Sequence, residues 1–173
     1  SVMATARDIL YLWVARMVML GLYRTGEVPF KEVYLWGTIT DTEGKKMSKS
    51  RGNVTNPLDF TSQYGTDALR LALTIGITPG LGGSISEEKI TGYRNFCNKL
   101  WNVARYITSS VNASFEAVEP ELLSPADHWF AGRVNQAIDK IDPYMQTYKY
   151  SEAGQVIYSL LWDCLLYTSD AAD

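Results

Sequence analysis

A change of hydrophobic pattern at residues 78–84 constrains the fold of this chain more than any other feature. The stretch Thr78-Pro79-Gly80-Leu81-Gly82-Gly83-Ser84 is the most glycine-rich of the sequence, and such a composition is typical of a connector. Before it, apolar segments with strand character alternate with helical ones. After it, apolar residues recur at helical spacing. The sequence therefore predicts an α/β unit followed by an all-α unit.

Residues 1–80 are predicted to form the end of an α/β domain, because strand and helix alternate but too few strands are present for a complete sheet. The first helix is apolar nearly all round, a pattern that indicates burial. The predicted elements are a strand end at residues 1–4, a helix at 8–20, a strand at 32–36 that ends at Gly37, a turn at 41–44, and helices that begin at Pro57 and at Thr66.

Residues 84–163 are predicted to form a helical bundle. Ser84 and Glu87 fit a capping box at the start of the first helix, and an apolar stripe follows it. Ser124-Pro125 opens a second helix, and residues 151–162 form a third, so an antiparallel arrangement is expected. The stripe consists of Tyr93, Phe96, Cys97, Leu100, Trp101, Ala104 and Ile107.

The composition narrows the functions open to this chain. Its one histidine, His128, excludes any metal site built on several histidines, and no metal site is expected. Cys97 and Cys164 form no C-x-x-C pair, which favours a reducing, cytoplasmic location. The apolar run from Ile9 to Leu22 is interrupted twice and is shorter than the roughly 17–25 residues of a membrane-spanning helix.

Charge is distributed unevenly along the chain. Residues 1–85 hold nine Lys/Arg and seven Asp/Glu, a net charge of +2, whereas residues 86–173 hold seven and twelve, a net charge of −5. Within the first part, Lys45, Lys46, Lys49 and Arg51 lie between Gly44 and Asn53 with no acid among them. Lysine ammonium groups are common partners of phosphate oxygens, so this loop is a candidate phosphate-binding element. A solvated surface loop is the alternative.

The loop contains Lys46-Met47-Ser48-Lys49-Ser50, the KMSKS signature of the class I aminoacyl-tRNA synthetases, which this chain resembles. The signature lies in the longer matching context Gly-x-Lys-Met-Ser-Lys-Ser-x-Gly-Asn, and residues 56–59 and 64–70 continue the match. Residues 5–17, 26–31 and 93–102 resemble the valyl branch of the family. The isoleucyl and leucyl branches share the KMSKS context and are alternatives. The resemblance covers about residues 1–163.

The resemblance implies a fold and an activity. Residues 1–80 would be the C-terminal part of a Rossmann-like catalytic domain that carries the KMSKS loop, and residues 84–163 the start of a helical anticodon-binding domain. The family joins its amino acid, here valine, to tRNA through an aminoacyl-adenylate made from ATP. Implied partners are therefore tRNA, valine and ATP, with Mg²⁺ accompanying the ATP, in a monomeric parent enzyme.

Site roles follow by matching positions. Lys49 would contact the ATP phosphates and Lys46 would support the loop as pyrophosphate leaves, which makes both catalytic residues. Asp8 matches an acidic position near the ribose and the amino acid, although a plain helix-start acid competes. Trp13 matches an aromatic that closes over the valine side chain, with a core tryptophan as the alternative. The remaining implied ATP-binding residues are Met47, Ser48, Ser50 and Gly37.

A donor-rich face is also predicted on the first bundle helix. Arg94, Asn95, Asn98, Asn102 and Arg105 recur at roughly i+4 spacing, opposite the apolar stripe. Such side chains suit RNA phosphate and sugar contacts, so Arg94, Asn98, Asn102 and Arg105 are candidate tRNA-binding residues. A solvated face is the alternative.

Two departures from the family pattern predict an internal piece of a longer enzyme that is inactive alone. The family's other ATP signature, His-x-Gly-His, needs two histidines, and no editing insertion is present. Residues 164–173 do not continue the family pattern and are expected to be a non-native tail. The competing hypotheses are a stand-alone tRNA-binding module and a non-catalytic paralogue.

Overall fold

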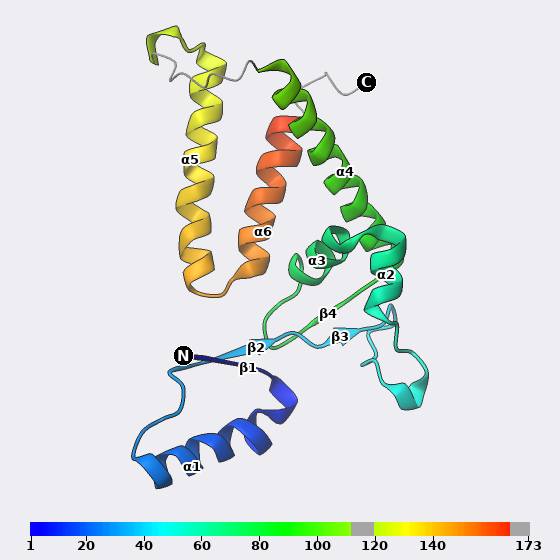
Figure 1. Ribbon diagram of the computed structural model, residues 1–173, viewed down its shortest axis with the longest axis vertical. Coiled ribbons are helices and arrows are strands. Elements are labelled where there is room, and N and C mark those ends of the chain that lie inside the picture. Colours follow the sequence, from blue (N-terminus) through cyan, green and yellow to red (C-terminus); the bar gives the residue numbers. More distant parts are fainter. Residues whose placement is uncertain (112–119, 167–173) are drawn as a thin grey trace. The chain divides into compact units, whose positions relative to one another are not determined.

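The computed structural model describes residues 1–111 and 120–166, which form two compact units. The first unit combines Ser1–Asn56 with Gly76–Ser86, and the second combines Pro57–Ile75 with the chain from Glu87 onward. The units therefore interleave along the sequence, because the helical segment Pro57–Ile75 packs with the later helices (Figure 1).

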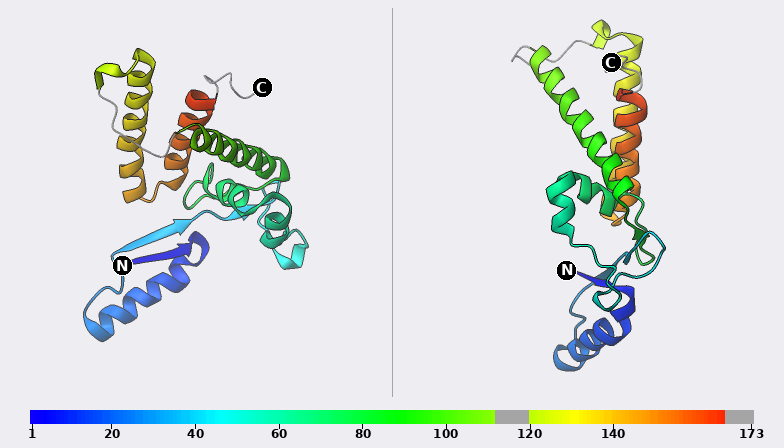
Figure 2. Two further views of the ribbon diagram at one scale, coloured as in Figure 1. Left: turned by 45° about the horizontal axis from the view of Figure 1, so that its top comes forward. Right: turned by 90° about the vertical axis from the view of Figure 1, so that its right-hand side faces the viewer.

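A parallel strand pair forms the base of the first unit. Strand β1 (Val2–Ala6) lies beside β2 (Glu32–Trp36) (Figures 1 and 2). In the register of this pair Ala4 lies opposite Tyr34. Parallel neighbours need a crossover, and here it is a helical segment that starts as a 3-10 turn at Arg7–Ile9, continues as a π-helix at Leu10–Val14 and ends as α1 (Ala15–Thr25). The predicted strand at residues 32–36 is confirmed, and the predicted helix continues five residues beyond Leu20.

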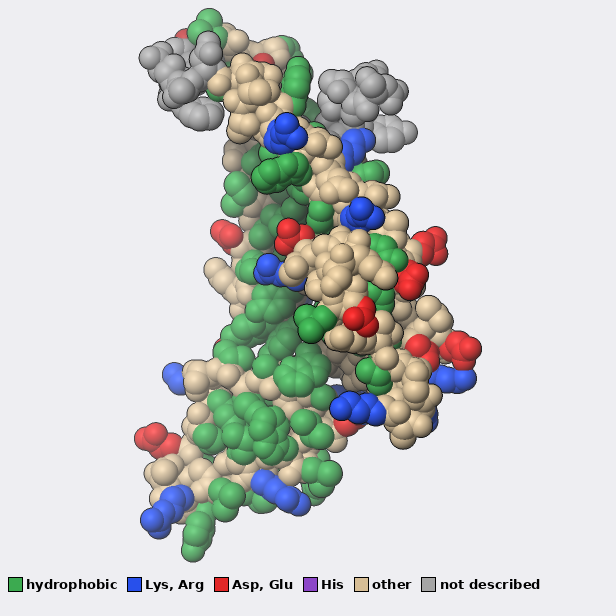
Figure 3. All heavy atoms as spheres, turned by 45° about the vertical axis from the view of Figure 1, so that its right-hand side comes forward, with side chains coloured by type: hydrophobic (Ala, Val, Ile, Leu, Met, Phe, Trp, Pro, Cys, Tyr) green, Lys and Arg blue, Asp and Glu red, His purple; other side chains and the backbone are tan. Residues whose placement is uncertain are grey.

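Helix α1 is exposed, and the expectation of a buried helix is wrong. The side chains of Leu20 and Tyr23 are 66% and 89% exposed, Tyr11 on the preceding π-helix is 83% exposed, and hydrophobic side chains gather over this unit (Figure 3). The reason lies in the partner surface. The sheet beside this helix has only two strands and covers little of a helix that is apolar all round, so that no residue of α1 is buried. Trp13 is accordingly 44% exposed and not a core residue.

The glycine-rich stretch 78–84 is part of the first unit's structure and does more than connect. Strand β4 (Gly83–Ser84) pairs in parallel with β3 (Ile39–Thr40), and the amide of Ile85 donates to the carbonyl of Thr40 at 3.3 Å. Because Ser84 lies in a strand and the next helix begins at Glu87, the predicted capping box at Ser84 is wrong.

The second unit is helical. Three predicted start positions of helices are confirmed, at Pro57, Thr66 and Pro125. At the last of these, Ser124 and Asp127 form a capping box in which the Ser124 hydroxyl accepts from the Asp127 amide at 3.3 Å. The elements are α2 (Pro57–Tyr64), α3 (Thr66–Thr74), α4 (Glu87–Ser110), a 3-10 turn (Pro120–Leu122), α5 (Pro125–Gln146), α6 (Tyr150–Ser159) and a π-helix (Leu160–Leu166).

An aromatic cluster forms the centre of the helical unit. Phe96 on α4 is 3% exposed, and its ring centroid lies 4.6 Å from that of Tyr158 and 5.9 Å from that of Trp162. The predicted apolar stripe is only partly buried, because Trp101 farther along α4 is 68% exposed. In the described part of the chain no helix is long and apolar enough to cross a membrane.

Candidate active site around the basic loop

The candidate site is built on residues 41–53, called the basic loop below. It starts with a tight turn at Asp41, whose carboxylate accepts from the amides of Glu43 at 3.0 Å and Lys45 at 2.8 Å. The amide of Gly44 donates to the Asp41 carbonyl at 3.0 Å, and Gly44 has a φ of 77° that favours glycine. Aspartate side chains commonly stabilise turns in this way. The predicted turn at residues 41–44 is confirmed.

Asn53 closes the other end of the loop. Its Nδ2 donates to Asp41 Oδ2 at 2.9 Å and to the carbonyl of Lys46 at 3.4 Å, and its Oδ1 accepts from the amide of Ser48 at 2.9 Å. Asp41, Ser48 and Asn53 are half-buried. The hydrogen bond from Asn53, together with that from the Lys45 amide, holds the pKa of Asp41 below its ordinary value. Asp41 is therefore an ionised acceptor at neutral pH.

The cations of the loop are exposed, in contrast to the polar residues that hold it. Lys45 pairs with Glu43 of the same turn at 2.6 Å, and Lys46 pairs with Asp8 at 2.5 Å. Lys49 and Arg51 lie on a 3-10 turn that spans Lys49–Arg51, and neither takes part in an ion pair within residues 1–111 and 120–166. Two ammonium groups are thus already paired with carboxylates, while two cations face solvent.

Asp8 and Lys46 are two predicted site residues, 38 positions apart, that the fold brings together. Asp8 lies on the 3-10 turn directly after β1, at the carboxyl end of that strand. The hydrogen bond and the charge of Lys46 lower the pKa of Asp8 from its ordinary value. Ligands of parallel sheets commonly bind at this end of the strands, so the basic loop reaches the edge at which a nucleotide is expected.

Gly37 follows β2 and lies in close contact with the glycine-rich stretch. A Cβ at Gly37 would come within 2.6 Å of the Gly82 Cα. The absence of a side chain at Gly37 is therefore required by this backbone approach, whether or not a nucleotide also binds there. Trp36 beside it and Trp13 on the crossover are both 44% exposed.

The candidate RNA face lies on α4. Arg94, Asn98, Asn102 and Arg105 are all exposed along one continuous helix. Their contact with RNA stays a prediction. The same unit has a cavity of about 560 Å³ between α3, α4 and α6, lined by Asp67, Arg70, Trp101 and others.

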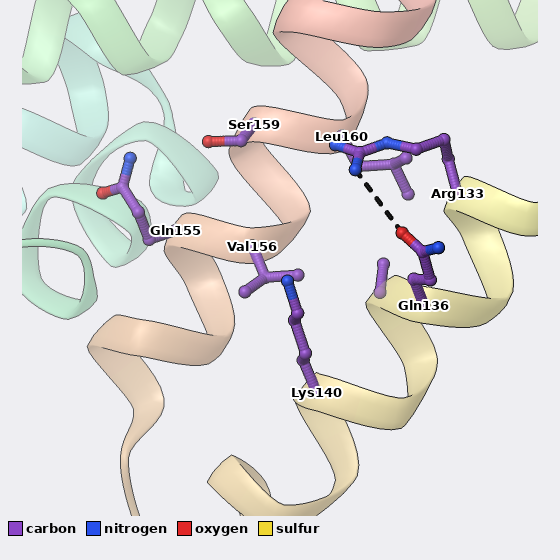
Figure 4. Close-up of a pocket in the computed structure, with 8 residues that line it drawn as sticks. Arg133, Gln136, Lys140, Gln155, Val156, Ser159 and Leu160 are labelled. Atoms are coloured by element: carbon purple, nitrogen blue, oxygen red, sulfur yellow. Dashed lines mark hydrogen bonds between the residues drawn. The ribbon is translucent and has the colours of Figure 1, made fainter. Parts of the chain in front are cut away.

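A second, smaller cavity of about 250 Å³ lies between α5 and α6. Figure 4 shows Arg133 and Lys140 of α5 turned toward Val156 of α6 and Leu160 at the start of the π-helix. Arg133 donates to Gln136 at 3.5 Å. Sequence reasoning missed this groove. The seven-residue spacing of its two bases on one helix was an available signal, but periodicity does not identify the helix that forms the opposite wall.

Asp41 and Asn53 are the residues at the site to which sequence reasoning assigned no role. Aspartate at the start of a turn was a signal for Asp41. Its bond to Asn53, twelve residues away, has no local signature. The arrangement can do one thing well: it presents exposed ammonium and guanidinium groups on a loop tied at both ends, which suits the neutralisation of a polyanionic ligand.

Comparisons with known proteins place this geometry in context. A family model described as "tRNA synthetases class I (I, L, M and V)" matches residues 1–83. The valine–tRNA ligase of Dehalococcoides mccartyi strain CBDB1 is 41% identical over 162 residues. That match covers 94% of this chain and 18% of the relative, so the chain spans about a fifth of the length of such relatives.

Two solved structures are also similar. The Mycobacterium tuberculosis methionyl-tRNA synthetase in complex with methionyl-adenylate has a TM-score of 0.77 at 25% identity, and it covers 97% of this chain and 33% of the other. The LeuRS–tRNA–LeuAMS ternary complex of Agrobacterium radiobacter K84 has a TM-score of 0.73 at 23% identity, over 94% of this chain and 22% of the other. The second likeness concerns the fold alone.

Proposed function

We propose that this chain is a segment of a valine–tRNA ligase, a class I tRNA synthetase that joins valine to its tRNA with the energy of ATP. The observation that carries the proposal is the basic loop, tied at Asp41 and Asn53 and placed beside Asp8. The 41% identity to a valine–tRNA ligase over 94% of the chain supports valine over isoleucine and leucine.

The proposed reaction uses the loop as a charge-neutralising element. A carboxylate oxygen of valine attacks the α-phosphorus of ATP, and the bond from that phosphorus to the bridging oxygen of the β-phosphate breaks. Valyl-adenylate and pyrophosphate result, and the tRNA 3′ end then takes the valyl group. Positioning and charge neutralisation dominate catalysis of such steps. Lys49, which like Arg51 faces solvent without an ion pair in the described chain, is the KMSKS residue that would receive phosphate oxygens.

The other predicted site residues take supporting roles in this proposal. Lys46 would leave Asp8 for the departing pyrophosphate, while Ser48 and Ser50, whose hydroxyls lie 3.2 Å apart, would contribute hydrogen bonds together with the Met47 backbone. Asp8 would face ribose and amino acid. Gly37 would lie near adenine and Trp13 near the valine side chain.

The finer architecture is likewise proposed. Residues 1–80 would complete a Rossmann-like catalytic domain, and residues 84–163 would begin an anticodon-binding bundle that contacts tRNA through the exposed face of α4. The parent enzyme would be a cytoplasmic monomer. Mg²⁺ would arrive with the ATP phosphates.

Valine-dependent exchange of pyrophosphate into ATP by the full-length enzyme tests the proposal. We expect exchange with valine, and exchange with isoleucine or leucine instead of valine would overturn the assignment. Lys49→Ala should slow exchange about ten- to a hundredfold, because a charge-assisted hydrogen bond contributes about 1.5–3 kcal/mol. The KM for valine should change little. Lys31→Ala, which removes an exposed lysine of the same unit outside the loop, is the matched control.

A further inference from the structure

We propose that the side-chain amide of Asn53 is the positioning group of the basic loop, and that its neutral charge is required because it must donate to Asp41 while it accepts from Ser48. The inference rests on the proposed function for its activity readout, and on the hydrogen-bond geometry for its second readout. It concerns how the cations are held and adds no new contact to the substrates.

Asn53 uses both of its N–H donors and its acceptor oxygen at this position. A neutral amide has two N–H donors and one acceptor oxygen. The donors go to Asp41 Oδ2 at 2.9 Å and to the Lys46 carbonyl at 3.4 Å, and the oxygen accepts from the Ser48 amide at 2.9 Å. One side chain therefore connects the turn at the start of the loop with the segment that carries the KMSKS residues.

The bond to Ser48 fixes the direction of the cations that follow it. Ser48 is the extended residue immediately before the 3-10 turn Lys49–Arg51, with φ −148° and ψ 145°. The Ser48 amide is held by Asn53 and its carbonyl accepts from the amide of Arg51 at 3.1 Å. Lys49 and Arg51 therefore project from a segment whose backbone is restrained on both sides, although their own side chains are exposed.

The chemistry at this position discriminates between an amide and a carboxylate of the same shape. An aspartate at position 53 could still accept from Ser48, but it could donate neither to Asp41 nor to the Lys46 carbonyl. It would also bring a second negative charge to within about 3 Å of Asp41, and like charges at that separation oppose ionisation of both groups. The loop would then lose its closure without any loss of side-chain volume.

The double variant Asp41→Asn, Asn53→Asp should restore most of these hydrogen bonds. With asparagine at 41 and aspartate at 53, the side chain at 41 can still accept from the amides of Glu43 and Lys45 through its oxygen. Its NH₂ can donate to the new carboxylate, which can accept from Ser48 as well. Of the bonds described, only the one to the Lys46 carbonyl has no replacement.

The test uses Asn53→Asp, Asp41→Asn and the double variant in the full-length enzyme, with Asn135→Asp on exposed α5 as the matched control. We expect Asn53→Asp to lower the rate of valine-dependent pyrophosphate exchange by about tenfold or more, with the KM for valine unchanged. The double variant should recover most of that loss, and Asn135→Asp should behave as the wild type.

Limited trypsin digestion supplies the second readout, because trypsin cleaves after lysine and arginine. The Asn53→Asp variant should be cut faster at Lys45, Lys46, Lys49 and Arg51, with no change in cleavage at Lys31. Equal loop cleavage in wild type and variant, or a double variant no better than Asn53→Asp, would overturn the inference. A wild-type enzyme without valine-dependent exchange would instead contradict the proposed function and leave the cleavage comparison to decide the role of Asn53.

Discussion

Replacing Gly82 by alanine should destabilise the first unit far more than the same replacement at Gly26. Gly82 has a φ of 94°, and a Cβ there would lie 2.0 Å from the carbonyl oxygen of Thr38 and 2.8 Å from its nitrogen. Both atoms belong to the backbone, so no side chain can turn aside to make room. The contact is also made where β3 and β4 pair, because the next amide, that of Gly83, donates to the same carbonyl.

The magnitude can be divided into two parts. An alanine with φ in the left-handed region costs about 1–2 kcal/mol. Gly26, with φ 74° and nothing within 4 Å of its Cβ position, would pay this cost alone. At Gly82 the backbone must also move apart, and overpacking of this kind costs about 1–3 kcal/mol. We therefore expect a loss of about 2–5 kcal/mol at Gly82 and about 1–2 kcal/mol at Gly26.

Hydrogen exchange measured by mass spectrometry resolves the two units in one experiment. Segments 32–40 and 78–86 should lose protection in Gly82→Ala, and segment 125–146 of the helical unit serves as the internal reference. Since about 1.4 kcal/mol corresponds to a factor of ten, protection of the two segments should fall about thirtyfold or more. Protection in Gly82→Ala equal to that in Gly26→Ala would refute the close-approach reasoning and leave φ as the only cost.

Two further predictions address the helical unit and the site. Phe96→Ala should lower the free energy of unfolding, measured with urea, by about 3–5 kcal/mol, because the ring is buried against Tyr158 and Trp162. Trp101→Ala on the same helix should lower it by about 0.5 kcal/mol or less. Equal losses in the two variants would contradict the assignment of the core. Lys46→Met should raise the pKa of Asp8 toward 3.8, measured by NMR titration of the carboxyl group, because Lys46 is the main cause of the lowered value. Because the pKa of Asp8 is lower in the folded state than in the unfolded state, the ion pair stabilises the fold above about pH 3.8, and this stabilisation is lost as the pH falls through the folded pKa. An Asp8 titration unchanged by Lys46→Met would show that the ion pair does not form in solution.

Local signals in the sequence were sufficient for most elements. Pro57 and Pro125 at helix starts, and the β-branched and aromatic run Glu32–Trp36, act on their own backbone and need no partner, so those predictions are confirmed. The burial of α1 was different. An apolar helix surface predicts a partner, but whether one covers it depends on the width of the neighbouring sheet, and here that sheet has two strands and no α1 residue is buried.

The capping box assigned to Ser84 failed for a related reason. Ser84 and Glu87 have the right spacing, yet the backbone of Gly83 and Ile85 is already committed to Thr38 and Thr40 through the β3–β4 pairing. A residue in a strand cannot also adopt the cap position of a helix that begins three residues later. Non-local strand pairing, which leaves a weak trace in a two-residue strand, overrode a strong local motif.

The candidate site also contains residues that the sequence identified and residues that only the structure revealed. The KMSKS residues were identified by resemblance, because a motif of consecutive residues can be matched from the sequence alone. The residues that hold them were not, since Asp41 and Asn53 are joined by side chains across twelve positions and Asp8 reaches Lys46 across thirty-eight. Each of these contacts depends on where β1, β2 and the turn at Asp41 place their ends. Spacing alone does not carry that information.

The charges of the basic loop explain why its cations need the polar residues that hold its backbone. Four exposed cations repel one another, so a loop that carries them would spread apart unless its backbone were held by other groups. Asp41 supplies a negative charge that accepts from the backbone at the start of the loop, and Asn53 carries that restraint to Ser48 without adding a second charge. Lys45 and Lys46 are compensated by Glu43 and Asp8. A phosphate ligand would therefore meet Lys49 and Arg51 on a restrained backbone, and the cost of ordering the loop would already be met before the ligand arrives.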